Sequence, residues 1–178
     1  MQPVVIVLPG YLDSGPEHWQ TLWCNAHPEY VRIQGLDWLH PHADDWIGAL
    51  DAAVRDRKQS TVIVAHSLGV LTTAMWGQIA RPGVVGALLV TPPDSEAPIF
   101  PDEIVGYQPM PRGRLAFPST LVASHNDPWM SFDRAADFAR AWGSTLVDAG
   151  MVGHLNVDSG FGPWNAGELL LAGVREGA

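Results

Sequence analysis

The chain has 178 residues and a formal net charge of −9 at pH 7, which disfavours binding to nucleic-acid phosphates or to anionic membrane surfaces. Its only cysteine, Cys24, excludes an intrachain disulfide and a cage of thiolate metal ligands, and no apolar run reaches the ~18 residues of a membrane-spanning helix. We therefore expect one domain over residues 1–178 and, because the N-terminus lacks the features of a signal peptide, a cytoplasmic location.

Six short apolar segments alternate with longer amphipathic ones. Most of the short segments are continuously apolar, which is typical of parallel strands buried on both faces of a sheet. Alternation of such strands with helices predicts an α/β fold with a mostly parallel, doubly wound sheet and helices on both faces. The six expected strands are Val4–Leu8, Tyr30–Gln34, Thr61–Ala65, Gly86–Thr91, Ser119–Ala123 and Thr145–Asp148.

Helix signals occupy the stretches between and after these strands. Ser131 is a favourable N-cap and Gly143 a favourable C-terminal stop, so together they bound one predicted helix. The segment Ser14-Gly15-Pro16-Glu17 is typical of a capping box and predicts the start of another. The five helices are expected from this box to Leu22, from the pair Asp44-Asp45, after Ser67 with Leu68, Leu71, Met75 and Ile79 on one face, from Ser131 to Gly143, and from about Trp164 to Val174.

The longest stretch without a regular pattern runs over residues 91–118 and contains seven prolines. Irregular loops of this length inside a compact domain are uncommon and are often functional. Two interpretations stay open from the sequence: the segment forms the rim of a binding site, or it is a solvated excursion.

The clearest chemical signature is Ala65-His66-Ser67-Leu68-Gly69. An apolar strand ends there and a helix begins at once, and small residues stand two positions before and after Ser67. This is the context of a nucleophile elbow, in which a strained turn presents the serine hydroxyl above the sheet. Position 65 is Ala where the usual pattern has Gly. The alternative interpretation is that Ser67 is an ordinary N-cap of a crossover helix.

Two further candidates stand at the ends of later strands. Asp127 follows the strand Ser119–Ala123, and His154 follows the strand Thr145–Asp148. Parallel strands gather their functional residues at this carboxyl edge, and the chain order Ser, Asp, His is that of α/β-hydrolases. We predict Ser67 as the nucleophile, His154 as the base and Asp127 as the orienting acid. Asp148 is a second plausible acid, but it shares its strand and loop with the histidine.

Backbone groups near Ser67 are candidates for an oxyanion hole. The helix that starts at Leu68 directs its N–H groups and positive dipole end at the site. Gly10 follows the first strand and lets the backbone bend toward the serine. We therefore predict the N–H groups of Leu68 and Tyr11 as the two donors, with Leu12 as the alternative to Tyr11.

Nearly the whole chain resembles the small serine hydrolases of the YdeN and retinoblastoma-binding protein 9 type. The most specific shared segment is Gly153-His154-Leu155-Asn156 followed by Ser159-Gly160-Phe161-Gly162-Pro163-Trp164. The other shared features are Pro9-Gly10, Gly15-Pro16-Glu17-His18-Trp19-Gln20, Asp37-Trp38 with Pro41, Asp45-Trp46, Ala65-His66-Ser67-Leu68-Gly69 and Asn126-Asp127-Pro128. Asn165 departs from the pattern, where relatives tend to carry Pro. The resemblance implies a compact α/β-hydrolase fold with little or no lid and a Ser-His-Asp triad.

These features predict an enzyme that hydrolyses small carboxylic esters through an acyl-enzyme intermediate. Hydrolysis of amides or aminoacyl compounds, and a non-catalytic binding or scaffold role on the same fold, are the alternatives. We expect a small-molecule acyl substrate, no organic cofactor and no metal, and no nucleic-acid or membrane partner; the oligomeric state is not indicated.

Several aromatic side chains accompany the predicted triad. Trp129, two residues beyond the acid, is expected in the pocket wall. His66, at the variable position of the elbow, is expected to point away from the serine hydroxyl and to serve packing or a helix-end hydrogen bond. His18 and His125 could line the site, but each is expected to be structural.

Overall fold

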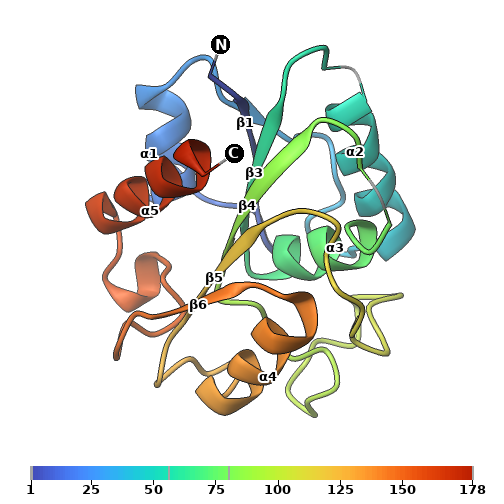
Figure 1. Cartoon of the computed structure of the whole chain (residues 1–178). Helices are drawn as coiled ribbons and strands as arrows, with labels where there is room; N and C mark the ends of the chain where they lie inside the picture. The colour runs from blue at the N-terminus through green and yellow to red at the C-terminus, as the bar shows by residue number, and fades with distance from the viewer. Residues whose placement is uncertain (1, 56, 80, 178) are drawn as a thin grey trace.

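Six strands form one parallel sheet in the order β2-β1-β3-β4-β5-β6 (Figure 1). The computed structural model describes residues 2–55, 57–79 and 81–177. The expected α/β class with a parallel sheet is confirmed, and every strand pair is parallel. The strands are β1 (Val4–Leu8), β2 (Val31–Arg32), β3 (Thr61–His66), β4 (Val84–Val90), β5 (Ser119–Ala123) and β6 (Thr145–Asp148).

The register of the central strands brings two loops together at the carboxyl edge of the sheet. Leu8 at the end of β1 pairs with Ala65 near the end of β3. The residues that follow these partners, Gly10 and Ser67, are therefore neighbours. Because all side chains of β3 are buried, its position in the sheet is fixed by apolar packing on both faces.

Helices cover both faces of the sheet, α2, α3 and α4 on one and α1 and α5 on the other (Figure 1). Each face has its own core. Trp46 and Leu50 of α2 pack against the first face, and Trp19 and Trp23 of α1 pack with Trp164 against the second. The helices are α1 (Trp19–Ala26), α2 (Ala43–Arg55), α3 (Leu68–Trp76), α4 (Phe132–Trp142) and α5 (Asn165–Glu176). In the described part of the chain, no helix has both the length and the apolar character needed to cross a membrane.

The predicted start of α1 is wrong. Ser14 does not cap the helix, because its hydroxyl donates to the side chain of Gln20. The helix begins four residues later than the capping box suggests, and His18 is the N-cap, with its Nδ1 accepting the N–H of Gln20. A tertiary contact of Ser14 thus replaces the local one that the sequence pattern suggests.

The end of α3 also differs from the prediction. The helix stops at Trp76, and Ile79, expected on its buried face, lies beyond the end with 63% of its surface exposed. Gly77 is the C-cap, and Phe117 packs so closely against it that a Cβ there would lie 2.7 Å from the Phe117 ring. Packing of the irregular segment against Gly77 therefore accompanies the end of the helix.

The irregular segment between β4 and β5 is packed against the molecule and is not a solvated excursion. It buries Phe100, Tyr107 and Phe117 against the first face of the sheet. The Tyr107 hydroxyl hydrogen-bonds to Thr72 of α3, and Ser95 donates to the Tyr107 carbonyl. The segment has a defined position above α3, where it can form one wall of a site at the carboxyl edge.

Candidate active site

Ser67 lies in a strained turn between β3 and α3. Its φ of 54° and ψ of −122° fall in a region that non-glycine residues rarely adopt, which costs on the order of 1–3 kcal/mol. Two features hold the turn: the Ser67 N–H donates to the Val90 carbonyl, and Gly69 packs directly on the end of β1. A Cβ at Gly69 would lie 2.6 Å from the carbonyl oxygens of Leu8 and Pro9. The small residue two positions after the serine is therefore a steric requirement.

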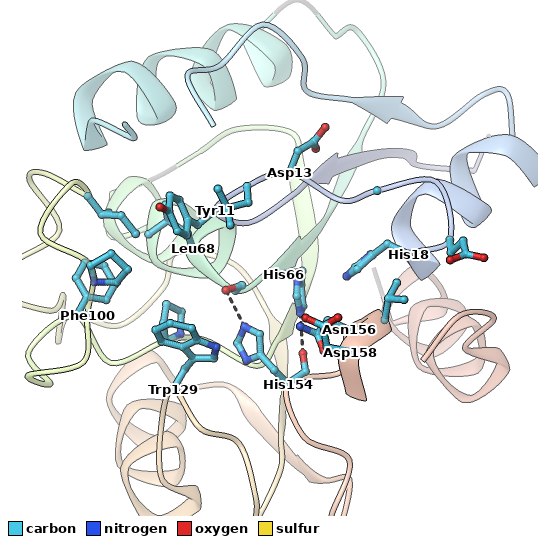
Figure 2. Close-up of a pocket in the computed structure, with 18 of the residues that line it drawn as sticks. Tyr11, Asp13, His18, His66, Leu68, Phe100, Trp129, His154, Asn156 and Asp158 are labelled. Atoms are coloured by element: carbon cyan, nitrogen blue, oxygen red, sulfur yellow. Dashed lines mark hydrogen bonds between the residues drawn. The ribbon is translucent and has the colours of Figure 1, made fainter. Parts of the chain in front are cut away.

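The structure brings His154 and Asp127 together with Ser67. Nε2 of His154 lies 2.8 Å from the Ser67 hydroxyl, a hydrogen bond drawn as a dashed line in Figure 2, and Nδ1 lies 3.0 Å from each carboxylate oxygen of Asp127. The side chains of His154 and Asp127 are 6% and 3% exposed. Because a carboxylate can only accept, Nδ1 carries the hydrogen and Nε2 presents its lone pair to the serine. This tautomer suits removal of the serine proton.

Asp148, the second candidate acid, makes other contacts. One carboxylate oxygen lies 2.9 Å from Nε2 of His125, and the other accepts the N–H of Gly150. The hydrogen bond to His125, followed by that from Gly150, holds the pKa of this carboxyl below its usual value. The structure therefore places Asp127, and not Asp148, against the imidazole of His154.

Two backbone N–H groups beside Ser67 have no hydrogen-bond acceptor among the described residues. They belong to Leu68, in the first turn of α3, and to Tyr11. Gly10 brings the Tyr11 loop close, since a Cβ at Gly10 would lie 2.7 Å from that of Ser67. The alternative donor, Leu12, is already engaged, because its N–H donates to the Trp38 carbonyl at 3.1 Å.

Three consecutive backbone N–H groups in the loop that carries His154 donate hydrogen bonds to side chains. The N–H of Val152 donates to the Ser124 hydroxyl, and that of Gly153 donates to the Asn126 side-chain oxygen at 2.7 Å. The N–H of His154 donates to the Ser159 hydroxyl. Asn126 is the neighbour of Asp127, so one short turn positions both the acid and the loop of the base.

The backbone carbonyl of His154 is also fixed by hydrogen bonds. It accepts hydrogen bonds from Nε2 of His66 at 2.9 Å and from the hydroxyl of Thr91 at 3.1 Å. Burial, assisted by the neighbouring His154 and His18, holds the pKa of His66 well below its usual value, so the ring stays neutral. His66 thus makes a structural hydrogen bond, but to a residue far away in the sequence and not at a helix end as predicted. The role of Thr91 is not predicted from the sequence, although its position directly after β4 is a signal that could have suggested it.

A cavity of about 570 Å³ surrounds the Ser67 hydroxyl. Trp129 lies in its wall, as the sequence predicts, and so does His18, which caps α1. Figure 2 shows two kinds of wall, with Tyr11, Phe100 and Trp129 on one side of the His154 ring and His18, Asn156 and Asp158 on the other. We call them the apolar half, formed by Tyr11, Leu68, Phe100, Pro101, Ile104 and Trp129, and the polar half, formed by Glu17, His18, Asn156 and Asp158. Within the described ranges, no group of three His, Cys, Asp or Glu side chains could hold a metal ion.

The fold resembles those of hydrolases of known structure. A YdeN-like hydrolase from Pectobacterium atrosepticum is 36% identical, and the match covers 98% of this chain and 91% of that one with a TM-score of 0.87. The product of the ydeN gene from B. subtilis is 21% identical over 97% of this chain and 98% of that one, with a TM-score of 0.78. A carboxylesterase from Bacillus cereus shares the fold at 14% identity over 99% of this chain and 89% of that one, with a TM-score of 0.64.

The sequence comparisons agree with this structural likeness. No significant match was found among curated protein sequences. The model of a family described as serine hydrolase matches residues 5–173, which is nearly the whole chain. Together with the YdeN-like relative at 36% identity, this match confirms the resemblance stated from the sequence. The chain belongs to the serine hydrolase family, and its fold is that of the α/β-hydrolases.

Proposed function

We propose that this serine hydrolase cleaves small carboxylic esters with Ser67 as nucleophile, His154 as general base and Asp127 as the acid that orients it. The observation that carries the proposal is the continuous hydrogen-bonded chain from the Ser67 hydroxyl through both nitrogens of His154 to Asp127. A nucleophile next to a base that is itself oriented by a third group is the general arrangement for covalent catalysis.

The reaction follows from the tautomer of His154. The Ser67 oxygen attacks the ester carbonyl carbon, and its proton passes to Nε2 of His154. That proton then goes to the departing alkoxide, so an alcohol leaves and Ser67 stays acylated. Water attacks the acyl group in the second half, giving a proton to His154, and the acid leaves as Ser67 regains its hydrogen. Asp127 stabilises the imidazolium that exists between these transfers.

The N–H groups of Leu68 and Tyr11 are the proposed donors to the oxyanion. Both lack another acceptor among the residues described, and both belong to the segments that meet at Ser67. Donors of this kind contribute most when they are aimed in advance at the developing charge. The close approach of Gly10 to Ser67 supplies that orientation. A small acyl substrate and a cytoplasmic location stay predictions.

Covalent labelling tests the assignment of the nucleophile. Treatment with a fluorophosphonate, followed by peptide mass spectrometry, should place the adduct on Ser67. Ser67→Ala should abolish labelling and the hydrolysis of an activated acetate ester. Ser131→Ala is the matched control, because it removes an exposed serine that caps α4 outside the cavity, and it should label normally. An adduct on another serine, or full activity of Ser67→Ala, would refute the proposal.

A further inference from the structure

His18 holds a hydrogen-bond donor that has no partner in the described part of the chain. Its Nδ1 accepts the N–H of Gln20, so in the neutral ring the hydrogen is on Nε2. Burial lowers the pKa of His18 to about 4, so the ring is neutral at pH 7. The residue is only 5% exposed, and Nε2 contacts no acceptor. Buried donors in native proteins are rarely left unpaired, so this one calls for a ligand acceptor.

The unpaired donor faces the polar half of the active-site cavity. Figure 2 shows the His18 ring directed toward His66 and Asn156, beside Asp158. No lysine or arginine is among the described residues that line the cavity. Glu17 and Asp158 also line the cavity, are exposed, and make no ion pair with any described residue. A ligand group here meets the Nε2–H donor of His18, the side-chain NH2 group of Asn156 and two carboxylates without an ion pair.

The polar half lies on the side of the site from which the leaving group departs. His154 must protonate the departing oxygen, and Asn156 and Asp158 follow it in the same loop. The ring of His66 stands between His154 and His18, with ring centroids 5.0 Å and 4.8 Å away. The acyl group then lies on the opposite side, in the apolar half.

We propose that the polar half selects a hydroxyl-bearing leaving alcohol, so that the substrates are short acyl esters of a polyol, with His18 as the specificity-determining residue. A hydroxyl group beside the ester is the group that satisfies both features, since its oxygen accepts from Nε2 of His18 and its hydrogen donates to Asp158 or Glu17. An anionic group would be repelled by the two carboxylates, and an ammonium group would leave the His18 donor unpaired. This inference rests on the proposed ester hydrolysis.

Two butanoate esters of nearly equal size test the selection. The 2,3-dihydroxypropyl ester carries two hydroxyls, and the 2-methylbutyl ester has a methyl group in place of each. We expect kcat/KM to be about tenfold higher for the dihydroxypropyl ester, because a site built to bond a hydroxyl rejects the analogue that lacks it. The preference should not depend on salt concentration, since the group selected is uncharged.

Variants locate the selection at His18. His18→Asn keeps an oxygen that can cap α1 but removes the donor at the Nε2 position, so the ratio of kcat/KM for the two esters should fall to about one. The double change Glu17→Ala with Asp158→Ala should also reduce the ratio, and it alters only exposed side chains. Asp137→Ala, which removes an exposed carboxylate from α4, is the control for charge and should keep the wild-type ratio.

The outcomes separate this inference from the proposed function. Equal kcat/KM values for the two esters in the wild type, or an unchanged ratio in His18→Asn, would overturn the selection and leave ester hydrolysis standing. A salt-sensitive preference for a choline ester over its 3,3-dimethylbutyl analogue, larger than the preference for the diol, would also overturn it in favour of a cationic alcohol. Absence of Ser67 labelling and of any ester turnover would instead refute the proposed function, and this inference with it.

Discussion

At the residue scale, two aspartates at neighbouring strand ends have different surroundings and should have different functions. Asp127 contacts His154 through both oxygens, whereas Asp148 binds His125. Asp127→Asn should lower kcat by on the order of 10⁴, because an amide beside Nδ1 no longer fixes the imidazole in the active tautomer. Asp148→Asn should keep most of the activity. Steady-state kinetics of both variants measure the difference.

Circular dichroism should show that both aspartate variants fold. Asn at position 127 still offers an oxygen to the Trp129 N–H, which now donates to Asp127. A dead Asp148→Asn enzyme together with an active Asp127→Asn enzyme would reverse the assignment of the acid.

The sequence predicts which chemically active residues meet, because the rule that parallel strands end at one edge places Ser67, Asp127 and His154 on the same side. It leaves the choice between Tyr11 and Leu12 open. That choice depends on the Trp38 carbonyl, which occupies the Leu12 N–H. The roles of these residues in catalysis stay predictions. A backbone hydrogen bond between distant segments thus shows which of the two N–H groups is free, and the local sequence pattern cannot show this.

At the element scale, the turn between β3 and α3 tolerates no larger residue than glycine at position 69. Gly69→Ala should destabilise the fold by about 1–3 kcal/mol, because the added methyl group meets two backbone carbonyls that cannot move aside. Gly48→Ala in α2 is the matched comparison: a Cβ there meets nothing within 4 Å. It should stabilise the helix by about 0.5–1 kcal/mol. Urea denaturation of the two variants gives both values, and a Gly69→Ala protein as stable as wild type would contradict the packing argument.

The sequence predicts the strands and helices best where the local residue pattern agrees with the contacts that the element makes in the folded protein. The bounds of β1, β5 and β6 agree with the prediction, as do the cap of α4 at Ser131 and its stop at Gly143. β2 is shorter than expected, with two residues, because it pairs only with β1 at the edge of the sheet. α1 begins late because Ser14 bonds to Gln20 instead of capping the helix. Side-chain contacts of this kind are not visible in hydrophobic periodicity.

At the scale of the whole molecule, two buried neutral histidines should make the fold sensitive to acid. The pKa of His18 falls from 6.5 to about 4 on folding, and that of His66 is also lowered. Between these values the unfolded chain binds more protons than the native protein, so stability falls as the pH drops below 6.5. His18 alone should remove about 2 kcal/mol of unfolding free energy between pH 7.5 and pH 5.

The contribution of His18 can be isolated with His18→Asn, which keeps an N-cap but does not titrate. Its loss of unfolding free energy between pH 7.5 and pH 5, measured with urea, should be smaller than that of the wild type by about 2 kcal/mol. Carboxylates with lowered pKa values, such as Asp148 and Glu96, lose their contribution at lower pH and do not enter this window. Identical pH dependence in the two proteins would show that His18 is not held neutral by the fold.

The size of the molecule also limits the acyl group that the site can hold. No helix is inserted between β4 and β5, and the irregular segment there places Phe100 and Ile104, each nearly buried, in the wall of the apolar half. Acyl and leaving groups share one cavity of about 570 Å³, so a long chain would have to extend into water, where its methylene groups gain nothing from burial.

We therefore expect kcat/KM to be highest for short acyl chains in a series of esters of one alcohol. Phe100→Ala should move the optimum to longer chains, because it removes a large side chain from the wall of the apolar half, whereas Leu169→Ala on the exposed face of α5 should not. Highest kcat/KM on long-chain esters in the wild type, or an optimum unmoved by Phe100→Ala, would show that the acyl group does not lie in the apolar half.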